Sequence, residues 1–279
     1  MAEVAVELEV IRFGRIKMPH DYVVRPPGRR LSRWLTGFRP GVDAFDGSCL
    51  AFVVRHPAVG VILVDTGLHP GAYGRVAADF GFPTGWMFRG LEPIGTPFDQ
   101  ALRQRGVDPA AVEQVVMTHL HVDHTSGIRL LPRAEFILAK AEWAAACRRT
   151  ARLKGYNPDH LPDAGRTRLV DLEHQGVPHG PLTHTVDLLG DGTMRLAWTP
   201  GHTPGHLSVV VRTRDRGEVL LVGDAAYTEG NIRRQALPLI TVDDTQARRS
   251  LAQLNAYADA HPSTLLVPSH DPTAWHQLT

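Results

Sequence analysis

The chain has 279 residues, of which 43% are hydrophobic and 21% are charged, and its formal net charge is +1. This composition is typical of an ordinary globular protein and excludes a disordered chain. A net charge so close to zero gives no electrostatic reason to expect a nucleic-acid partner or an anionic membrane. We therefore expect a single domain over residues 1–279.

The two cysteines, Cys49 and Cys147, do not form a CxxC pair, which argues against a disulfide framework and against cysteine ligation of zinc. The N-terminus alternates Val4, Val6 and Leu8, which is a strand pattern. A secretion signal would instead show a charged segment followed by an apolar one. We therefore expect a cytoplasmic protein.

The first third of the chain predicts strands and two unusual segments. Strands are expected at 4–12, 49–56 and 60–67. Residues 21–41 predict an arm that shapes a pocket or meets a second subunit, so a homodimer is one interpretation. Residues 68–98 are rich in Gly, Pro and aromatic side chains. Two interpretations of this segment stay open: a minor core that covers the sheet edge, and an insertion that lines a pocket beside the site.

The rest of the chain mixes strands with helices. The patterns predict a helix at 97–105, a strand at 113–119, a strand at 134–140 followed by a helix, and an irregular segment at 150–182. Strands follow near 183–189, 193–198, 206–212 and 218–223, then a helix at 243–259 and a strand at 264–270. This order favours an α/β protein whose sheets are covered by helices in layers.

The segment MTHLHVDHTSG, at 117–127, concentrates metal-binding side chains. Protonated imidazoles this close would repel one another, and neutral unpaired ones would be costly to bury, so a bound metal ion removes both problems. His119 and His121 are two residues apart and point to one side of an extended chain. Asp123 and His124 follow where the chain turns. The segment can therefore offer ligands in two directions, toward two metal ions.

Three further candidate ligands follow apolar strands, where the strand ends could meet at one edge of the sheets. They are His202 in TPGHTPGH, Asp224 in LLVGDAAY and His270 in LLVPSHD. His206 has a strand-like context and is interpreted as structural. The resulting set of imidazoles and carboxylates lacks a thiolate, which suits Zn²⁺ and also tolerates Fe, Mn or Co.

HLHVDH resembles the HxHxDH motif of the metallo-β-lactamase superfamily. VDTG at 64–67, GHTPGH at 201–206, GDA at 223–225 and SHD at 269–271 fit the order and spacing of that family. The resemblance implies an αββα sandwich with a dinuclear metal site at one edge of the two sheets.

The resemblance also implies the assignment of ligands. One metal ion would be held by His119, His121 and His202. The other would be held by Asp123, His124 and His270, and Asp224 would bridge the two. Asp65, in VDTG, matches a residue that usually supports the ligands from behind, although an aspartate of a simple strand-end turn is the alternative.

GDAAYT is similar to a segment of the N-acyl homoserine lactone lactonases, in which a tyrosine touches the substrate carbonyl. Tyr227 fills this position, and PSHDP at 268–272 also resembles that group. The resemblance implies a small-molecule lactone substrate, opened by attack of a metal-bridging hydroxide. Tyr227 and one metal ion would stabilise the oxyanion, as a fixed donor can, and Asp123 would relay a proton to the leaving alkoxide.

Other functions fit the same ligands. A phosphotriesterase or a thioesterase of the glyoxalase II kind would use the same two metal ions. A non-catalytic metal-binding protein would need a missing ligand, whereas all seven candidate positions are filled.

Overall fold

The structure is a computed structural model that describes residues 4–26 and 44–279. Among these residues, seven strands form the first sheet, in the order β4-β1-β2-β3-β5-β6-β7. Strands β1, β2 and β3 are antiparallel neighbours, and β3, β5, β6 and β7 run parallel. The bounds are Glu7–Pro19 (β1), Ala44–His56 (β2), Gly60–Val64 (β3), Leu91–Pro93 (β4), Gln114–Val116 (β5), Glu135–Ala139 (β6) and Thr167–Val170 (β7).

The second sheet has six strands in the described part of the chain, in the order β13-β12-β11-β10-β9-β8. Neighbours are antiparallel except β12 and β13, which are parallel. The bounds are Val177–His179 (β8), Leu182–Asp187 (β9), Met194–Trp198 (β10), Leu207–Thr213 (β11), Gly217–Gly223 (β12) and Leu265–Pro268 (β13).

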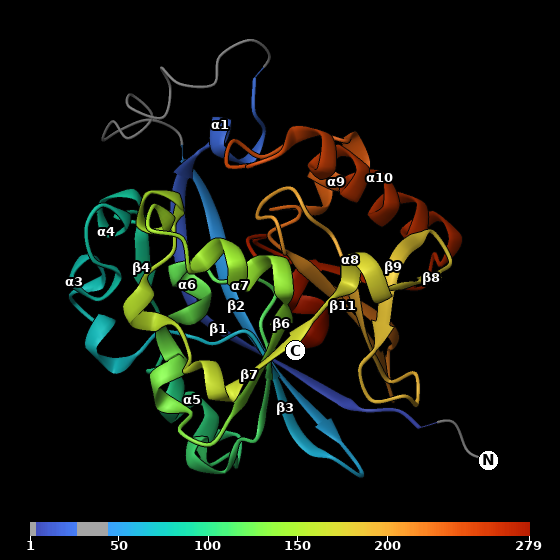
Figure 1. Cartoon of the computed structure of the whole chain (residues 1–279), viewed down its shortest axis with the longest axis horizontal. Helices are drawn as coiled ribbons and strands as arrows, with labels where there is room; N and C mark the ends of the chain where they lie inside the picture. Colours follow the sequence, from blue (N-terminus) through green and yellow to red (C-terminus); the bar gives the residue numbers. More distant parts are fainter. Residues whose placement is uncertain (1–3, 27–43) are drawn as a thin grey trace.

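Three apolar clusters define the layers of the molecule. The middle cluster joins the facing sides of the two sheets, with Leu50 and Val64 from the first and Val209 and Leu221 from the second. A second cluster packs the outer face of the first sheet against α5 (Phe98–Gln104) and its neighbours. A third packs the second sheet against α9 (Glu229–Arg234) and α10 (Asp244–Ala260). The fold is therefore the expected αββα sandwich (Figure 1).

Helix α10 shows why its sequence forms this outer layer. Asp243 caps its first turn by accepting hydrogen bonds from the backbone N–H groups of Thr245 and Gln246. Its buried face carries Leu251 and Leu254, at the spacing expected of an amphipathic helix. The shorter helices are α1 (His20–Val23), α3 (Val76–Phe80), α4 (Thr84–Met87), α6 (Val122–Thr125), α7 (Lys140–Ala146) and α8 (Leu172–Gln175).

Some strands differ in length from the prediction. Strands β1 and β2 are longer because they pair with each other almost throughout, from Glu7 opposite Arg55 to Pro19 opposite Ala44. Strand β5 is shorter because the chain leaves the sheet after Val116 to enter the histidine segment. The segment 150–182, expected to be irregular, contains the short edge strands β7 and β8, and β4 was not predicted.

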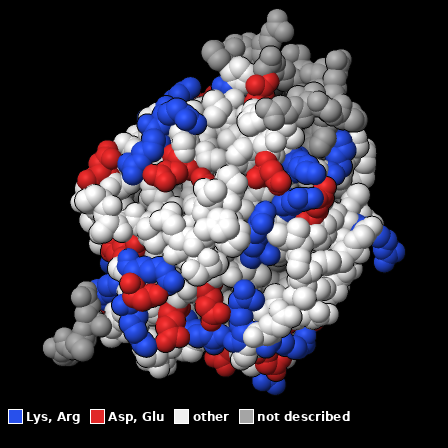
Figure 2. Space-filling view, turned by 180° about the vertical axis from the view of Figure 1, so that it is seen from behind, with Lys and Arg blue, Asp and Glu red and all other residues white. Residues whose placement is uncertain are grey.

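The described residues contain no helix that is both long enough and apolar enough to span a membrane. On the face shown in Figure 2, positive and negative side chains are interspersed. The predicted arm at 21–41 is described only as far as residue 26, and the remainder lies outside the described residues.

Candidate metal centre and active-site pocket

The seven candidate ligands lie together at one edge of the sandwich and are all buried. His119 and His121 follow β5, and the next two ligands stand on α6. His202 lies between β10 and β11, and the last two ligands follow β12 and β13. Their ligand atoms form three close groups: His119, His121 and His202; His119, His124 and Asp224; and Asp123, His124 and His270.

Asp224 lies between the first and the third group. Its Oδ2 is 3.5 Å from Nε2 of His202 and 3.1 Å from Nε2 of His270. Its Oδ1 is 3.5 Å from Nε2 of His124. The carboxylate therefore faces both groups, as a bridging ligand would have to.

Hydrogen bonds behind the ligands aim four imidazoles into the cluster. His124 and His270 place Nδ1 2.8 Å from Asp65 Oδ2 and from the carbonyl of Ser48, respectively. Nδ1 of His202 lies 3.0 Å from the carbonyl of Ile240, and Nδ1 of His119 lies 3.1 Å from the hydroxyl of Thr118. A ring that donates its Nδ1–H to such an oxygen keeps a lone pair on Nε2 for a metal ion.

Asp65 connects two of these supports. The backbone N–H of Thr118 donates to Oδ1 of Asp65 at 2.7 Å, and the Thr118 hydroxyl donates to Oδ2 at 2.7 Å. Asp65 adopts a left-handed backbone conformation with φ 57°, which is uncommon outside glycine. The structure therefore places Asp65 directly behind His124 and next to the support of His119, rather than in a solvent-exposed turn.

The donor set fits two metal ions. Within the described residues, Nε2 of His119, Oδ1 of Asp123 and Oδ1 of Asp224 are buried without a hydrogen-bond partner. Nε2 of His202 and Nδ1 of His121 face each other at 2.9 Å. Buried polar atoms are almost always satisfied, so this convergence of unsatisfied nitrogen and oxygen atoms is consistent with a dinuclear metal site.

The electrostatics of the cluster point the same way. Burial, with the charges of neighbouring imidazoles, holds the pKa values of His119 and His121 well below the ordinary value. Burial also lowers the pKa of His270, but the charge and hydrogen bond of Asp224, together with those of Cys49, raise that pKa well above the ordinary value. The carboxylates thus attract positive charge to this side of the cluster, which a divalent cation would supply.

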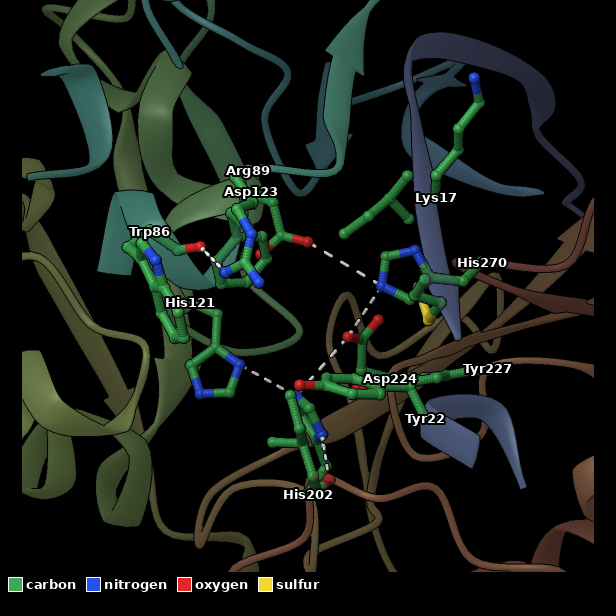
Figure 3. A pocket seen from close by; sticks show the side chains of 14 residues that line it. Lys17, Tyr22, Trp86, Arg89, His121, Asp123, His202, Asp224, Tyr227 and His270 are labelled. Atoms are coloured by element: carbon green, nitrogen blue, oxygen red, sulfur yellow. Dashed lines mark hydrogen bonds and ion pairs between the residues drawn. The ribbon is translucent and has the colours of Figure 1, made fainter. Parts of the chain in front are cut away.

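A pocket opens beside the metal centre (Figure 3). Its walls include five of the candidate ligands together with Tyr227, and most of the other lining side chains are apolar or aromatic. Tyr227 is 4% exposed, with its ring 5.0 Å from that of His270. Burial, and then the charges of Asp224 and Asp123, raise the pKa of the Tyr227 phenol well above its ordinary value, so the phenol keeps its proton.

Residues 44–270 match the family model described as "Metallo-beta-lactamase superfamily". The chain belongs to this superfamily. The match contains six of the strands of the first sheet, the whole second sheet and all seven candidate ligands.

Curated relatives within the superfamily are N-acyl homoserine lactonases. The chain is 36% identical to AttM of Agrobacterium fabrum over 233 residues, which cover 80% of this chain and 82% of that protein. It is 29% identical to AiiA of Bacillus thuringiensis subsp. kurstaki over 199 residues, or 70% of each chain. For AttM of Rhizobium radiobacter the match covers 64% of the relative's length.

Solved structures agree in fold. An N-acyl homoserine lactone hydrolase with N-hexanoyl-L-homoserine bound at its catalytic metal centre superposes with a TM-score of 0.75. It is 22% identical and covers 98% of this chain and 96% of its own. AidC, a dizinc quorum-quenching lactonase, gives a TM-score of 0.66 at 16% identity, covering 96% and 89%. At these identities, the likeness shows the metallo-β-lactamase fold.

His206 is not among the three groups of ligand atoms in this superfamily member. Its Nε2 accepts a hydrogen bond from the backbone N–H of Asp224 at 2.9 Å, and burial lowers its pKa to about 3. It therefore supports the segment that carries Asp224 as a neutral imidazole.

Sequence reasoning missed several residues of the pocket. Trp86 and Phe88 line the pocket and belong to the segment 68–98, for which a pocket lining was one interpretation. Arg89 of the same segment also lines the pocket but was not singled out. Tyr22, which lies within the described part of the predicted arm, also lines the pocket. The remaining additions are Ile16, Lys17, Met18 and Ile240. Strand alternation marks Ile16 and Met18 as sharing a face, but nothing in the sequence says that this face meets a pocket.

Proposed function

We propose that this metal-dependent hydrolase opens the ring of lactones, and of N-acyl homoserine lactones in particular. The observation that carries the proposal is the position of Tyr227, a buried, protonated phenol in the same pocket as Asp224 and His270. The names of the relatives AttM and AiiA, both N-acyl homoserine lactonases, support the same substrate class.

The ligand set would hold two divalent ions, which we expect to be Zn²⁺. One would lie among His119, His121 and His202, the other among Asp123, His124 and His270, with Asp224 between them. Such ions supply a water molecule that is ionised near neutral pH and positive charge beside the reacting carbonyl.

Tyr227 and Asp123 would handle the charges and protons of ring opening. The Tyr227 hydroxyl donates a hydrogen bond to the carbonyl oxygen as negative charge develops there, which stabilises the transition state more than the bound lactone. Asp123 lines the same pocket and carries a buried Oδ1 without a hydrogen-bond partner. Its carboxylate can accept the proton of the hydroxyl group that has added to the carbonyl carbon, and can pass this proton to the ring oxygen, which becomes the hydroxyl of the product.

The walls of the pocket favour a substrate with an apolar arm. Ile16, Met18, Phe88 and Ile240 offer apolar surface next to the metal ligands. Burying the methylene groups of an acyl chain against such surface is favourable by about 0.8 kcal/mol for each group. The segment 68–98, with Trp86 and Phe88, would act as the pocket-lining insertion.

A substrate panel tests the proposal. The metal-replete protein is assayed with N-acyl homoserine lactones, simple γ- and δ-lactones, paraoxon, S-lactoylglutathione and nitrocefin. We expect the highest kcat/KM with an acylated homoserine lactone. A higher value with paraoxon would make the protein a phosphotriesterase, and a higher value with S-lactoylglutathione would make it a thioesterase. Either result would overturn the lactonase proposal.

A further inference from the structure

Glu142 is a fully buried carboxylate outside the ligand set, in the first turn of α7. Its Oε1 accepts a hydrogen bond from the backbone N–H of Leu120 at 2.9 Å. Its Oε2 accepts one from the backbone N–H of Gly205 at 3.1 Å. One side chain therefore contacts two loops that are far apart in the sequence.

Both contacts lie next to ligands of one metal group. Leu120 is the residue between His119 and His121, and Gly205 follows His202 by three residues. These three histidines form the group that we assign to the first metal ion. Glu142 thus accepts hydrogen bonds from both of the loops that carry this group.

The packing around Glu142 leaves the second loop little freedom. A Cβ atom added to Gly205 would lie 2.1 Å from the backbone nitrogen of Glu142, so the loop lies directly against the start of α7. Only glycine allows this approach.

Tyr156 gives a second connection to His121. The two rings meet edge to face with centroids 5.0 Å apart, and the residues form an isolated β-bridge. Tyr156 therefore packs on His121, in the same loop whose Leu120 N–H donates to Glu142.

We propose that Glu142 is a positioning residue that fixes the distance between His121 and His202, and so preorganises the first metal group. The proposal rests on the dinuclear centre of the proposed function. Its physical basis is the number of acceptors, since a carboxylate offers two oxygens to two N–H groups. Without it, at least one buried N–H group loses its partner, and the two loops are no longer tied together.

The test is metal binding by the variant Glu142→Gln, which keeps the shape but replaces one acceptor oxygen by an NH₂ donor. Metal content is measured by elemental analysis, and the affinity of each site by competition with a chelator. Substitutions behind metal ligands typically cost about 10- to 100-fold in affinity, so we expect one of the two sites to weaken by this factor. The control is Glu135→Gln, an exposed residue on β6, which should bind as the wild type does.

The outcomes separate a positioning role from a merely structural one. If both metal sites of Glu142→Gln bind Zn²⁺ with the wild-type affinity, the proposal is overturned, even if the melting temperature of the variant is lower. If Glu142→Gln does not fold, the variant Glu142→Asp is used instead, because its shorter side chain cannot reach both loops. Wild-type metal affinities in Glu142→Asp would also overturn the proposal. If the wild-type protein binds fewer than two ions, the dinuclear centre itself is contradicted. This failure of the proposed function is distinguishable from a failure of the role of Glu142.

Discussion

Tyr227 and Asp65 show how single side chains acquire roles from their surroundings. Tyr227 is a phenol outside the candidate ligand set, and its ring centroid lies 5.0 Å from that of His270 and 6.0 Å from that of His202. Asp65 is a carboxylate that does not line the pocket and instead lies 2.8 Å from Nδ1 of His124. The first residue would act on the substrate, and the second would act through a ligand.

Tyr227→Phe removes one hydroxyl and little packing. Losing a donor to an oxyanion costs about 100- to 1,000-fold in kcat elsewhere, and a metal ion shares the task here, so we expect a loss of roughly 10- to 100-fold. The loss should fall mainly on kcat, and metal content should not change. The control is Tyr257→Phe. The Tyr257 hydroxyl donates a hydrogen bond to Glu218, and Tyr257 does not line the pocket. An unchanged kcat in Tyr227→Phe would make Tyr227 a packing residue.

Asp65→Asn should weaken metal binding at the site to which His124 belongs. The amide cannot accept the Nδ1–H of His124 and both bonds from Thr118 with only one oxygen, so the imidazole loses its fixed orientation. We expect the affinity of one metal site to fall by about 10- to 100-fold in a chelator competition. Asp163→Asn, at an exposed position, serves as the control. Equal affinities in both variants would show that Asp65 is only a turn residue.

The segment 68–98 is the element whose role depends most on context. Its aromatic residues lie in different environments. Phe80 is fully buried in the outer core of the first sheet, whereas Trp86 and Phe88 line the pocket. The sequence shows a cluster of aromatic residues but cannot show this division, because both uses require the same residue types.

Trp86→Ala should lower kcat/KM for lactones with an acyl arm and leave a simple γ-lactone unaffected. Trp86 lies in the pocket wall and is 43% exposed. The acyl arm of a substrate would therefore contact only part of its ring surface. We expect a loss of about 3- to 10-fold for armed substrates. Phe82→Ala is the matched control, since Phe82 belongs to the same segment but is 85% exposed and is not part of the pocket. Equal losses with armed and simple lactones would contradict a role in binding the arm.

Elements with strong local patterns were predicted within a few residues. Helix α10, expected at 243–259, spans Asp244–Ala260, and β11 and β12 match their apolar runs. The three-residue strands β4 and β8 were missed because they are defined by pairing with distant strands. Glu142 was missed because an acidic residue in the first turn of a helix is common on surfaces, and only the tertiary structure buries it.

At the scale of the whole molecule, the order of motifs along the chain predicted the fold and the position of the candidate centre. His119 and Asp224 are 105 positions apart in the sequence, yet their side chains approach to 3.9 Å because the ends of β5 and β12 meet at one edge. The sequence could not supply the pocket walls in the same way, because Ile16, Trp86 and Ile240 come from three elements without a shared motif.

The most direct test of this account is a titration of metal-free protein with Zn²⁺ while the opening of an N-acyl homoserine lactone is followed by proton release. We expect negligible hydrolysis without metal and a rise in activity that ends near two equivalents per chain, the number that the ligand set can hold. Full activity in the metal-free protein, or no lactone hydrolysis after two equivalents are bound, would contradict the account.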